Sequence, residues 1–308
     1  MTVNSEQSPQ LQETKANFNP NLKGRYRFDR VFKTISWIAT FAGIVVLTVL
    51  LIGILVSGLS SLSFDFIVNP PSRKPEIAGI WPPLIGTICL LVITALFAFP
   101  VGVGSGIFLE EFSEDNLFAK AVEINISNLA AVPSIIYGLL GLFVFARIFE
   151  PVTGGRSLLS GGLTLALLIL PVIIVATREA LRAVPDSLRL AGMALGATRW
   201  QTVRSHVLPQ ALPGIMTGTI LALSRAIGET APLIVVGAAT FVPFAPELSI
   251  KGLQSSFTAM PIQIFSWVSR PQDGFHEIAA GAIIVLMLVL LVMNGSAIWL
   301  RNKFQSNR

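Results

Sequence analysis

Two oppositely charged residues, Arg225 and Glu229, stand in an apolar stretch that runs from about residue 212 to residue 236. Their four-residue spacing places both side chains on one face of a helix, one turn apart. If this helix begins at Leu212 and crosses a membrane, Arg225 lies about 20 Å along it, near the middle of the bilayer. An arginine at that depth costs about 2.5 kcal/mol or more, so the pair is a candidate functional site.

The chemistry of this pair suits an oxyanion. The planar guanidinium of Arg225 can offer paired hydrogen bonds to a group such as phosphate. Glu229 would hold the arginine and prevent tight binding of the anion, because passage requires weak binding on the way through. Thr230 follows Glu229 directly, and we include it with the pair among the residues predicted to line the path of the anion through the membrane. The alternative is a structural ion pair that locks the helix against its neighbours, and the residues alone leave both interpretations open.

Gly228 and Pro232 flank the second charge of the pair. Pro232 has no amide hydrogen to donate to the carbonyl of Gly228, so the helix is weakened at this point. The pattern predicts either a gate or a plain kink here.

The sequence carries no familiar catalytic or metal-binding pattern. It has no G-x-x-x-x-G-K-[ST] loop for ATP, no H-E-x-x-H and no G-x-S-x-G, and its two histidines, His206 and His276, fall in different predicted loops. The single cysteine, Cys89, excludes an intramolecular disulfide and a cysteine zinc site. We therefore expect no catalytic residue, no metal ligand and no cofactor bound by this chain.

The composition indicates a membrane protein. Of the 308 residues, 53% are hydrophobic and 13% are charged, whereas water-soluble domains carry about 25% charged residues. Charge-free apolar stretches of about 18 residues or more predict spanning helices. Together with the stretch that holds the charge pair, they predict helices at residues 36–57, 84–109, 124–146, 158–177, 212–236 and 278–300. The predicted fold class is therefore all-α integral membrane, with six transmembrane helices.

Lysine and arginine gather in the N-terminal tail, in the loop 178–210 and in the C-terminal tail. The positive-inside rule therefore places both termini and this loop in the cytoplasm. The loop after the second predicted helix is a misfit, because it is acidic; its acidic residues are Glu110, Glu111, Glu114, Asp115 and Glu123. Acidic residues weigh little in the rule, so the predicted orientation stands.

The chain divides into four predicted segments. Residues 1–33 form a flexible cytoplasmic tail, since their polar, proline-containing sequence has no periodicity. Residues 34–83 hold the first transmembrane helix and an outer loop, and residues 84–300 form the main transmembrane domain. Residues 301–308 form a short cytoplasmic tail.

Within the loop 178–210, the pattern predicts a short helix followed by a turn. Asp186 or Ser187 can cap this helix at its beginning, and Gly196 can end it in a left-handed conformation. Three residues then share one face of the helix, namely Leu188, Ala191 and Leu195.

Thr198 can cap a second helix in this loop, which must stop before Pro209 because the residue before a proline disfavours helix. A hairpin of two short helices is either a docking element for a partner or a surface feature without one.

The same loop is similar to the coupling loop of bacterial ABC-importer permeases, whose motif reads E-A-A, three residues, G, nine residues, I-x-L-P. Gly196 is the glycine, while Leu190 and His206 replace the glutamate and the isoleucine. The resemblance implies that the loop couples the chain to an ATPase. The residues implied in this coupling are Leu188, Ala191, Gly192, Leu195, Gly196, Leu208 and Pro209.

Residues 224–233, S-R-A-I-G-E-T-A-P-L, are similar to the R-A-x-G-E-T-A-P-L signature of phosphate-importer permeases. The segment 260–276 resembles the A-type (PstA-like) member of the permease pair, and the likeness covers roughly residues 84–300. Membership of this family implies a six-helix permease with a type I ABC-importer core in the bacterial plasma (inner) membrane.

The resemblance also implies an activity and its partners. The chain would be a subunit of an ATP-driven importer of inorganic phosphate that works by alternating access. It would form the translocation path with a sister permease and assemble with two ATPase subunits, which bind ATP and Mg, and with an extracytoplasmic phosphate-binding protein. Membrane lipid would surround it, and no nucleic acid is expected.

Two alternatives remain. In an ATP-independent secondary anion transporter or channel, Glu229 would relay protons. Such transporters usually carry inverted repeats, and the sequence shows none. The other alternative is a permease of the same machinery for another oxyanion, such as sulfate or molybdate.

Overall fold

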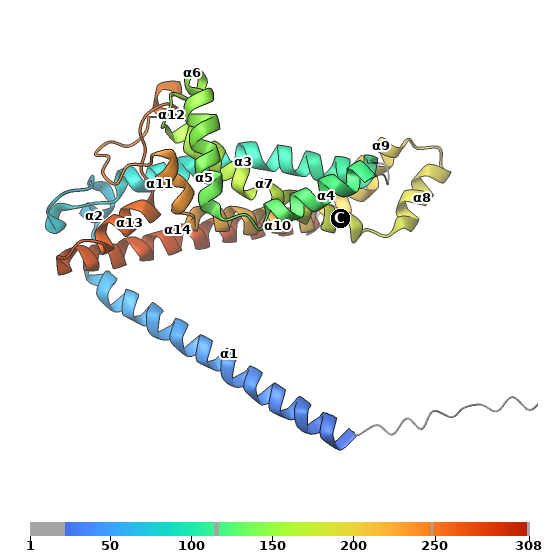
Figure 1. Ribbon diagram of the computed structural model, residues 1–308, viewed down its shortest axis with the longest axis horizontal. Coiled ribbons are helices and arrows are strands. Elements are labelled where there is room, and N and C mark those ends of the chain that lie inside the picture. The colour runs from blue at the N-terminus through green and yellow to red at the C-terminus, as the bar shows by residue number, and fades with distance from the viewer. Residues whose placement is uncertain (1–21, 114–116, 248, 307–308) are drawn as a thin grey trace, which may run out of the picture. The chain divides into compact units, whose positions relative to one another are not determined.

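The computed structural model describes residues 22–113, 117–247 and 249–306, which form helices and loops with no strand among them. Two units, Met1–Ile52 and Gly53–Arg308, are described one at a time (Figure 1). In the described residues, five helices are long and apolar enough to cross a membrane, and six if one bent pair counts as a single span. The expected all-α integral membrane fold is confirmed.

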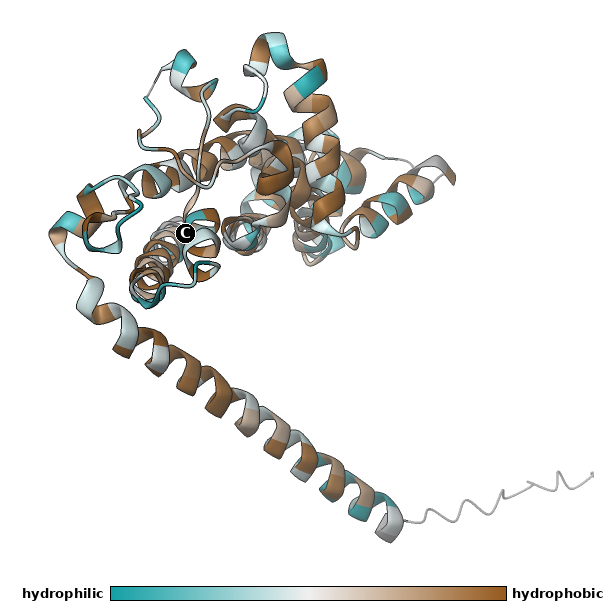
Figure 2. Cartoon of the chain, turned by 60° about the vertical axis from the view of Figure 1, so that its left-hand side comes forward, coloured by the Kyte–Doolittle hydropathy of each residue, from teal (hydrophilic) through white to brown (hydrophobic). Residues whose placement is uncertain are grey.

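The first helix, α1 (Leu22–Gly58), is longer than the stretch 36–57 predicted for it. The prediction of a flexible tail over 1–33 is wrong for residues 22–33, which are helical, while residues 1–21 lie outside the described part. Arginine and lysine are good helix formers, and an existing helix extends at little cost, so the span continues into its basic flank. Figure 2 shows this change from a mixed beginning to a hydrophobic middle.

The second unit is built around α7 (Leu158–Arg182), the candidate span with the largest buried share. Alongside it runs α3 (Trp81–Ile107), which continues to Phe112 as a wider π-helical turn. The two helices approach closely because glycine faces the contact. A Cβ added at Gly102 would lie 2.7 Å from Ile173 Cγ2 of α7, well inside van der Waals contact.

The predicted spans 84–109, 158–177 and 278–300 are confirmed as the apolar parts of α3, α7 and α14 (Asp273–Ser306). Each helix extends beyond its predicted limits at one end or both, since the backbone hydrogen bonds of a helix continue past its apolar part.

The third predicted span, 124–146, is not one helix, and that prediction is wrong. It consists of α4 (Leu117–Leu129) and α5 (Ser134–Phe143), which continues to Ile148 as a π-helical turn, and the two parts meet at an angle of 103°. Pro133 explains the break, since it disfavours helix at the residue before it and has no amide hydrogen. Figure 1 shows the resulting elbow.

The predicted end of the hairpin's second helix before Pro209 is also wrong. A single helix runs through α9 (Arg199–Thr202), a π-helical turn (Val203–Val207) and α10 (Leu208–Gly228). Pro209 sits in the first turn of α10, directly after the wider turn. A π-helical turn accommodates the proline ring, so the helix passes through.

The predicted helix 212–236 breaks near its end. Helix α10 ends at Gly228, the next two residues leave the helix, and α11 (Ala231–Val236) follows as a short separate helix. Pro232 stands in the first turn of α11, where a missing amide hydrogen costs nothing. The proline therefore starts a new helix instead of bending the old one.

Shorter elements complete the described chain. Their bounds are η1 (Leu59–Ser61), α2 (Phe64–Val68), η2 (Pro75–Ile77), α6 (Glu150–Thr153), α8 (Asp186–Ala194), α12 (Ile250–Leu253) and α13 (Met260–Val268). Helix α13 packs against α14 and α3 at the end of the bundle opposite to α8 (Figure 1).

The contact between α3 and α7 generates the first prediction. Gly102→Val should lower the stability of the purified protein by about 1–3 kcal/mol, because its side chain would force Ile173 and its helix away. The measurement is the thermal unfolding midpoint in detergent. Gly104→Val is the matched control, because no described atom lies within 4 Å of a Cβ placed there. Equal midpoints for the two variants would contradict the packing argument.

Candidate functional site

The predicted charge pair is formed in the structure. Arg225 Nε lies 3.4 Å from Glu229 Oε1, with the arginine in the last turn of α10 and the glutamate at its C-terminal cap. A cation in the last turn of a helix interacts favourably with the unpaired carbonyl groups there. The side chain of Arg225 is 52% exposed and that of Glu229 is 21% exposed. The guanidinium therefore keeps an open side that can receive an anion.

The two predicted gate residues and Thr230 lie at the break itself. Gly228 is the last residue of α10, and no atom in the described part of the chain lies within 4 Å of a Cβ placed on it. Thr230 occupies the N-cap position of α11, and Pro232 follows in its first turn. The predicted kink is a complete interruption of the helix. That it opens as a gate stays a prediction.

Polar contacts join α10 to α14, and one of them involves Ser224, the residue before Arg225. The Ser224 hydroxyl lies 2.6 Å from Asn294 Oδ1, and Arg301 Nη1 donates to Thr217 Oγ1 at 2.9 Å. These contacts escaped the sequence analysis. Asn294, a polar residue within a predicted span, was the available signal, since such residues commonly bond across helices.

The hairpin formed by α8 and α9 has the predicted turn but not the predicted first cap. Gly196 is left-handed, with φ of 79°, as expected. Thr198 caps α9: its hydroxyl accepts from Gln201 N at 3.3 Å, and the Gln201 side chain accepts from Thr198 N at 2.8 Å. Neither Asp186 nor Ser187 caps α8, because Pro185 holds that position.

The predicted shared face of α8 is only partly correct. Leu188 is half-buried and packs on the core cluster around Leu181 and Val207, so it points inward. Ala191 is exposed, and Leu195 is 89% exposed. Leu190 and Met193 are exposed as well. The outer surface of the hairpin therefore carries exposed apolar side chains, although they differ from the predicted set and stand among exposed polar residues such as Asp186 and Gln201.

The remaining predicted coupling residues lie inside the hairpin or at its base. Gly192 is buried, and a Cβ on it would lie 2.7 Å from two side-chain atoms of Thr202, so glycine lets α8 approach α9. Leu208 packs at the edge of the same core cluster, and Pro209 beside it is half-buried. These three residues shape the hairpin and do not form its outer surface.

A carboxylate on α3's π-helical extension holds the hairpin at its base. Glu111, whose side chain is 4% exposed, accepts from Arg189 Nη2 at 2.6 Å. Arg189 also donates to the carbonyl oxygens of Leu181 at 2.9 Å and Val184 at 2.8 Å, which closes the end of α7. Hydrogen bonding to Glu111 raises the pKa of Arg189 above its ordinary value. The guanidinium is thus a permanent link between α3, α7 and α8.

A second set of ion pairs joins α3, α4 and α7. Glu110 accepts from Arg178 Nε at 3.1 Å and from Arg182 Nε at 2.9 Å. Glu123 of α4 lies 3.2 Å from Arg178 and 3.4 Å from Arg182. We call the members of both sets the anchor cluster: Glu110, Glu111, Glu123, Arg178, Arg182 and Arg189.

The anchor cluster explains the acidic misfit of the second predicted loop. Three of its five carboxylates are partners of arginines at the end of α7 and in α8; Glu114 and Asp115 lie outside the described residues. The available signal was the topology, since six spans place this loop and the loop 178–210 on the same side of the membrane. Acidic and basic residues in two loops on one side of the membrane are expected to form ion pairs.

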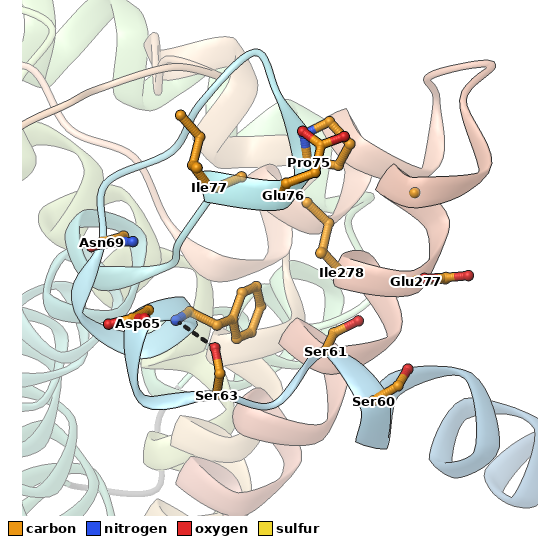
Figure 3. A pocket seen from close by; sticks show the side chains of 13 residues that line it. Ser60, Ser61, Ser63, Asp65, Asn69, Pro75, Glu76, Ile77, Glu277 and Ile278 are labelled. Carbon is orange, nitrogen blue, oxygen red and sulfur yellow. Dashed lines mark hydrogen bonds between the residues drawn. The ribbon is translucent and has the colours of Figure 1, made fainter.

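A separate polar pocket of about 460 Å³ lies against the beginning of α14 (Figure 3). Asp65, Glu76 and Glu277 line it together with Asn69 and several serines. Its carboxylates disfavour an oxyanion, so it is no part of the candidate anion site. Among the described residues, no group of three or more His, Cys, Asp or Glu is arranged to hold a metal ion.

Known proteins resemble this chain over most of its length. Residues 98–305 match the family model described as "Binding-protein-dependent transport system inner membrane component". The probable ABC transporter permease protein YqgI of Bacillus subtilis is 34% identical over 256 residues, covering 80% of this chain and 86% of that protein. The phosphate transport system permease protein PstA of Xylella fastidiosa is 32% identical over 275 residues, covering 88% and 92%.

A solved structure resembles the fold. It is a bacterial ABC transporter involved in the import of the acidic polysaccharide alginate, with a TM-score of 0.64 and 15% identity, covering 92% of this chain and 98% of that one. The likeness extends to the helical architecture alone.

The base of the hairpin generates the second prediction. Glu111→Ala should destabilise the protein by about 3 kcal/mol, because it leaves Arg189 without its buried partner. Hydrogen exchange should also rise across residues 184–196. Glu179→Ala is the control, since its side chain is 65% exposed and its 3.4 Å contact with Arg182 is worth about 1 kcal/mol at most. If exchange at the hairpin is the same in both variants, the anchor has no such role.

Proposed function

Because the chain belongs to the family of binding-protein-dependent transport system inner membrane components, we propose that it is the A-type permease of an ATP-driven importer of inorganic phosphate. That it is a multi-pass inner-membrane permease subunit of an ABC importer follows from the family itself. Phosphate as the substrate, the partners and the residue roles are the proposed part. PstA proteins among its relatives support this substrate.

The observation that carries the proposal is the half-exposed guanidinium of Arg225 at a break in a span. Its contact with Glu229 is long, at 3.4 Å, and engages one nitrogen, so the rest of the fork remains available. A phosphate oxygen can bind there in the geometry that suits guanidinium. Glu229 then repels the bound anion and keeps its residence short. Thr230 supplies a hydroxyl beside the pair.

The hairpin is the proposed contact with the ATPase. Its exposed residues Leu190, Met193, Leu195 and Trp200 form an apolar surface that an ATPase cleft can cover. Leu190 stands where the coupling motif of the family has glutamate, so this contact is apolar in our chain. ATP and Mg²⁺ bind to the two ATPase subunits, and this chain binds neither.

The assembly consists of this chain, a sister permease, two ATPase subunits and an extracytoplasmic phosphate-binding protein. Both termini face the cytoplasm, as the positive-inside rule indicates. ATP binding closes the ATPases, and the hairpin passes their motion through the anchor cluster to the bundle. The outer face opens, phosphate passes from its binding protein to Arg225, and hydrolysis restores the inward-facing state. The chain itself stabilises two packings and performs no covalent chemistry.

Phosphate uptake tests the role of Arg225. In cells that lack this chain, wild type should restore ATP-dependent uptake of labelled phosphate, and Arg225→Ala should lower it at least about tenfold, since a charge-assisted hydrogen bond is worth about 1.5–3 kcal/mol. Glu229→Ala should lower turnover because phosphate then binds too tightly. Lys120→Ala, an exposed cation on α4, is the control. Each variant is first checked for assembly with the ATPase.

Three results would count against the proposal. Uptake of sulfate or molybdate in place of phosphate would overturn the substrate assignment. Uptake that persists when the ATPase is inactive would indicate a secondary transporter or channel. Normal uptake by an assembled Arg225→Ala variant would make the arginine structural.

Leu195→Asp tests the hairpin. The change should lower the amount of ATPase that co-purifies with the permease at least about tenfold, because a charge would be buried against an apolar surface. Ser205→Asp, an exposed residue in the π-helical turn after α9, should leave the yield unchanged. Equal ATPase recovery with both variants would place the contact elsewhere.

A further inference from the structure

The two interrupted spans meet in the structure. The elbow between α4 and α5 and the break between α10 and α11 are far apart in sequence, yet α5 packs against α11 (Figure 1). The contact is between backbones: a Cβ placed on Gly138 of α5 would lie 2.7 Å from Pro232 Cα and 3.0 Å from its carbonyl oxygen. The part of the span that follows the break therefore rests directly on α5.

The neighbouring residue holds the part that precedes the break. Tyr137 is buried and belongs to the same packed cluster as Ala222 and Ala226 of α10. These two alanines stand on either side of Arg225 in the sequence. Adjacent residues of α5 thus support both halves of the broken span, and Glu229 and Thr230 lie between the two supports.

Tyr137 also closes the elbow. Its hydroxyl donates to the carbonyl oxygen of Leu129, the last residue of α4, at 2.8 Å. The same carbonyl also accepts from Val132 N at 3.1 Å, so the tyrosine adds a side-chain bond that reaches across the elbow to the end of α4. The orientation of α4 relative to α5 is therefore tied to the tyrosine that packs beside Arg225.

The other end of this connection lies at the anchor cluster. Glu123 of α4 is bound to Arg178 and Arg182 at the end of α7, where the hairpin begins. Packed and bonded residues therefore connect the hairpin base, through α4 and the elbow, with the charge pair. Such a connection transmits motion when it contains an element with two arrangements, and the elbow is the joint available for that.

We propose that the α4–α5 elbow is a positioning element, in which Tyr137 and Gly138 hold α10 and α11 so that Arg225 and Glu229 stand at the right separation. This inference rests on the proposed function of the charge pair in phosphate transport. When the hairpin moves, the elbow changes the separation of the two half-spans. The weak Arg225–Glu229 contact opens and releases the guanidinium to the anion.

Transport and ATP hydrolysis measured together test this proposal. The complete complex is reconstituted in lipid vesicles with the ATPases and the binding protein, and phosphate moved per ATP hydrolysed is determined. Tyr137→Phe should lower this ratio about fivefold, since it removes one hydrogen bond of about 1 kcal/mol and keeps the ring. Gly138→Ala should lower it further, because α5 and α11 cannot remain in contact.

The chain offers a matched control for each change. Tyr26→Phe removes the same hydroxyl from the other of the two tyrosines, which is exposed on α1. Gly104→Ala adds the same methyl group at a helical glycine with open space around it in the described structure. Both controls should keep the wild-type ratio.

The outcomes separate the elbow from the proposed function. A Tyr137→Phe complex with a wild-type ratio overturns the elbow proposal, including the case in which less complex assembles but each assembled copy is normally coupled. A lowered ratio with retained ATP hydrolysis supports it. The failure of wild type to move phosphate, or normal transport by Arg225→Ala, overturns the proposed function instead, whichever ratio Tyr137→Phe gives.

Discussion

The whole arrangement depends on one constraint: inside a membrane, each backbone amide and carbonyl must find a partner within the protein. A break in a spanning helix leaves several such groups without partners, and it persists only where other chain segments cover it. The described residues show two such breaks, and the helices that follow them, α5 and α11, pack against each other. At the first, the Leu129 carbonyl accepts from Val132 N and from the Tyr137 hydroxyl, and α5 packs against α11 at the second. The charge pair stands at this second break, with Arg225 in the last turn of α10 and Glu229 at its cap.

Ion pairs join the helices at the end of the bundle that carries the hairpin. Glu110, Glu111 and Glu123 are bound by three arginines that come from the end of α7 and from α8. Removing a single partner would leave an uncompensated charge, which is why such clusters hold helices together even when their net contribution to stability is small. The hairpin is therefore fixed through Arg189 to α7 and to the extension of α3, while its outer apolar side chains stay exposed. A fixed base together with an exposed apolar surface suits an element that contacts a moving partner.

Hydropathy predicted the positions of the spans but not their interruptions. A window of apolar residues has the same composition whether it forms one helix or two, so 124–146 and 212–236 were each expected to be continuous. Pro133 and Pro232 were the available signals, because each lacks an amide hydrogen and stands at the beginning of the helix that follows its break. Local rules succeeded where the cause is local, as with the left-handed Gly196 and the Thr198 cap.

Contacts between distant segments could not be predicted in this way. Glu110 and Arg178 are 68 residues apart and Glu111 and Arg189 are 78 apart, and helical spacing says nothing of such pairs. Leu188 turns inward because a core cluster lies beneath it, which the periodicity of α8 alone does not reveal. The charge pair itself was predictable, since its spacing is one turn. The end of the helix at Gly228, between the two charges, was not predictable from this spacing.

The continuous helix from Arg199 to Gly228 has a mechanical consequence. Its 30 residues make a rod about 45 Å long, whose lower part is one arm of the hairpin and whose upper end holds Arg225. Had Pro209 ended the helix, a flexible joint would separate the arm from the membrane. The π-helical turn keeps the helix continuous, so the arm of the hairpin and Arg225 belong to one helical element with no loop between them.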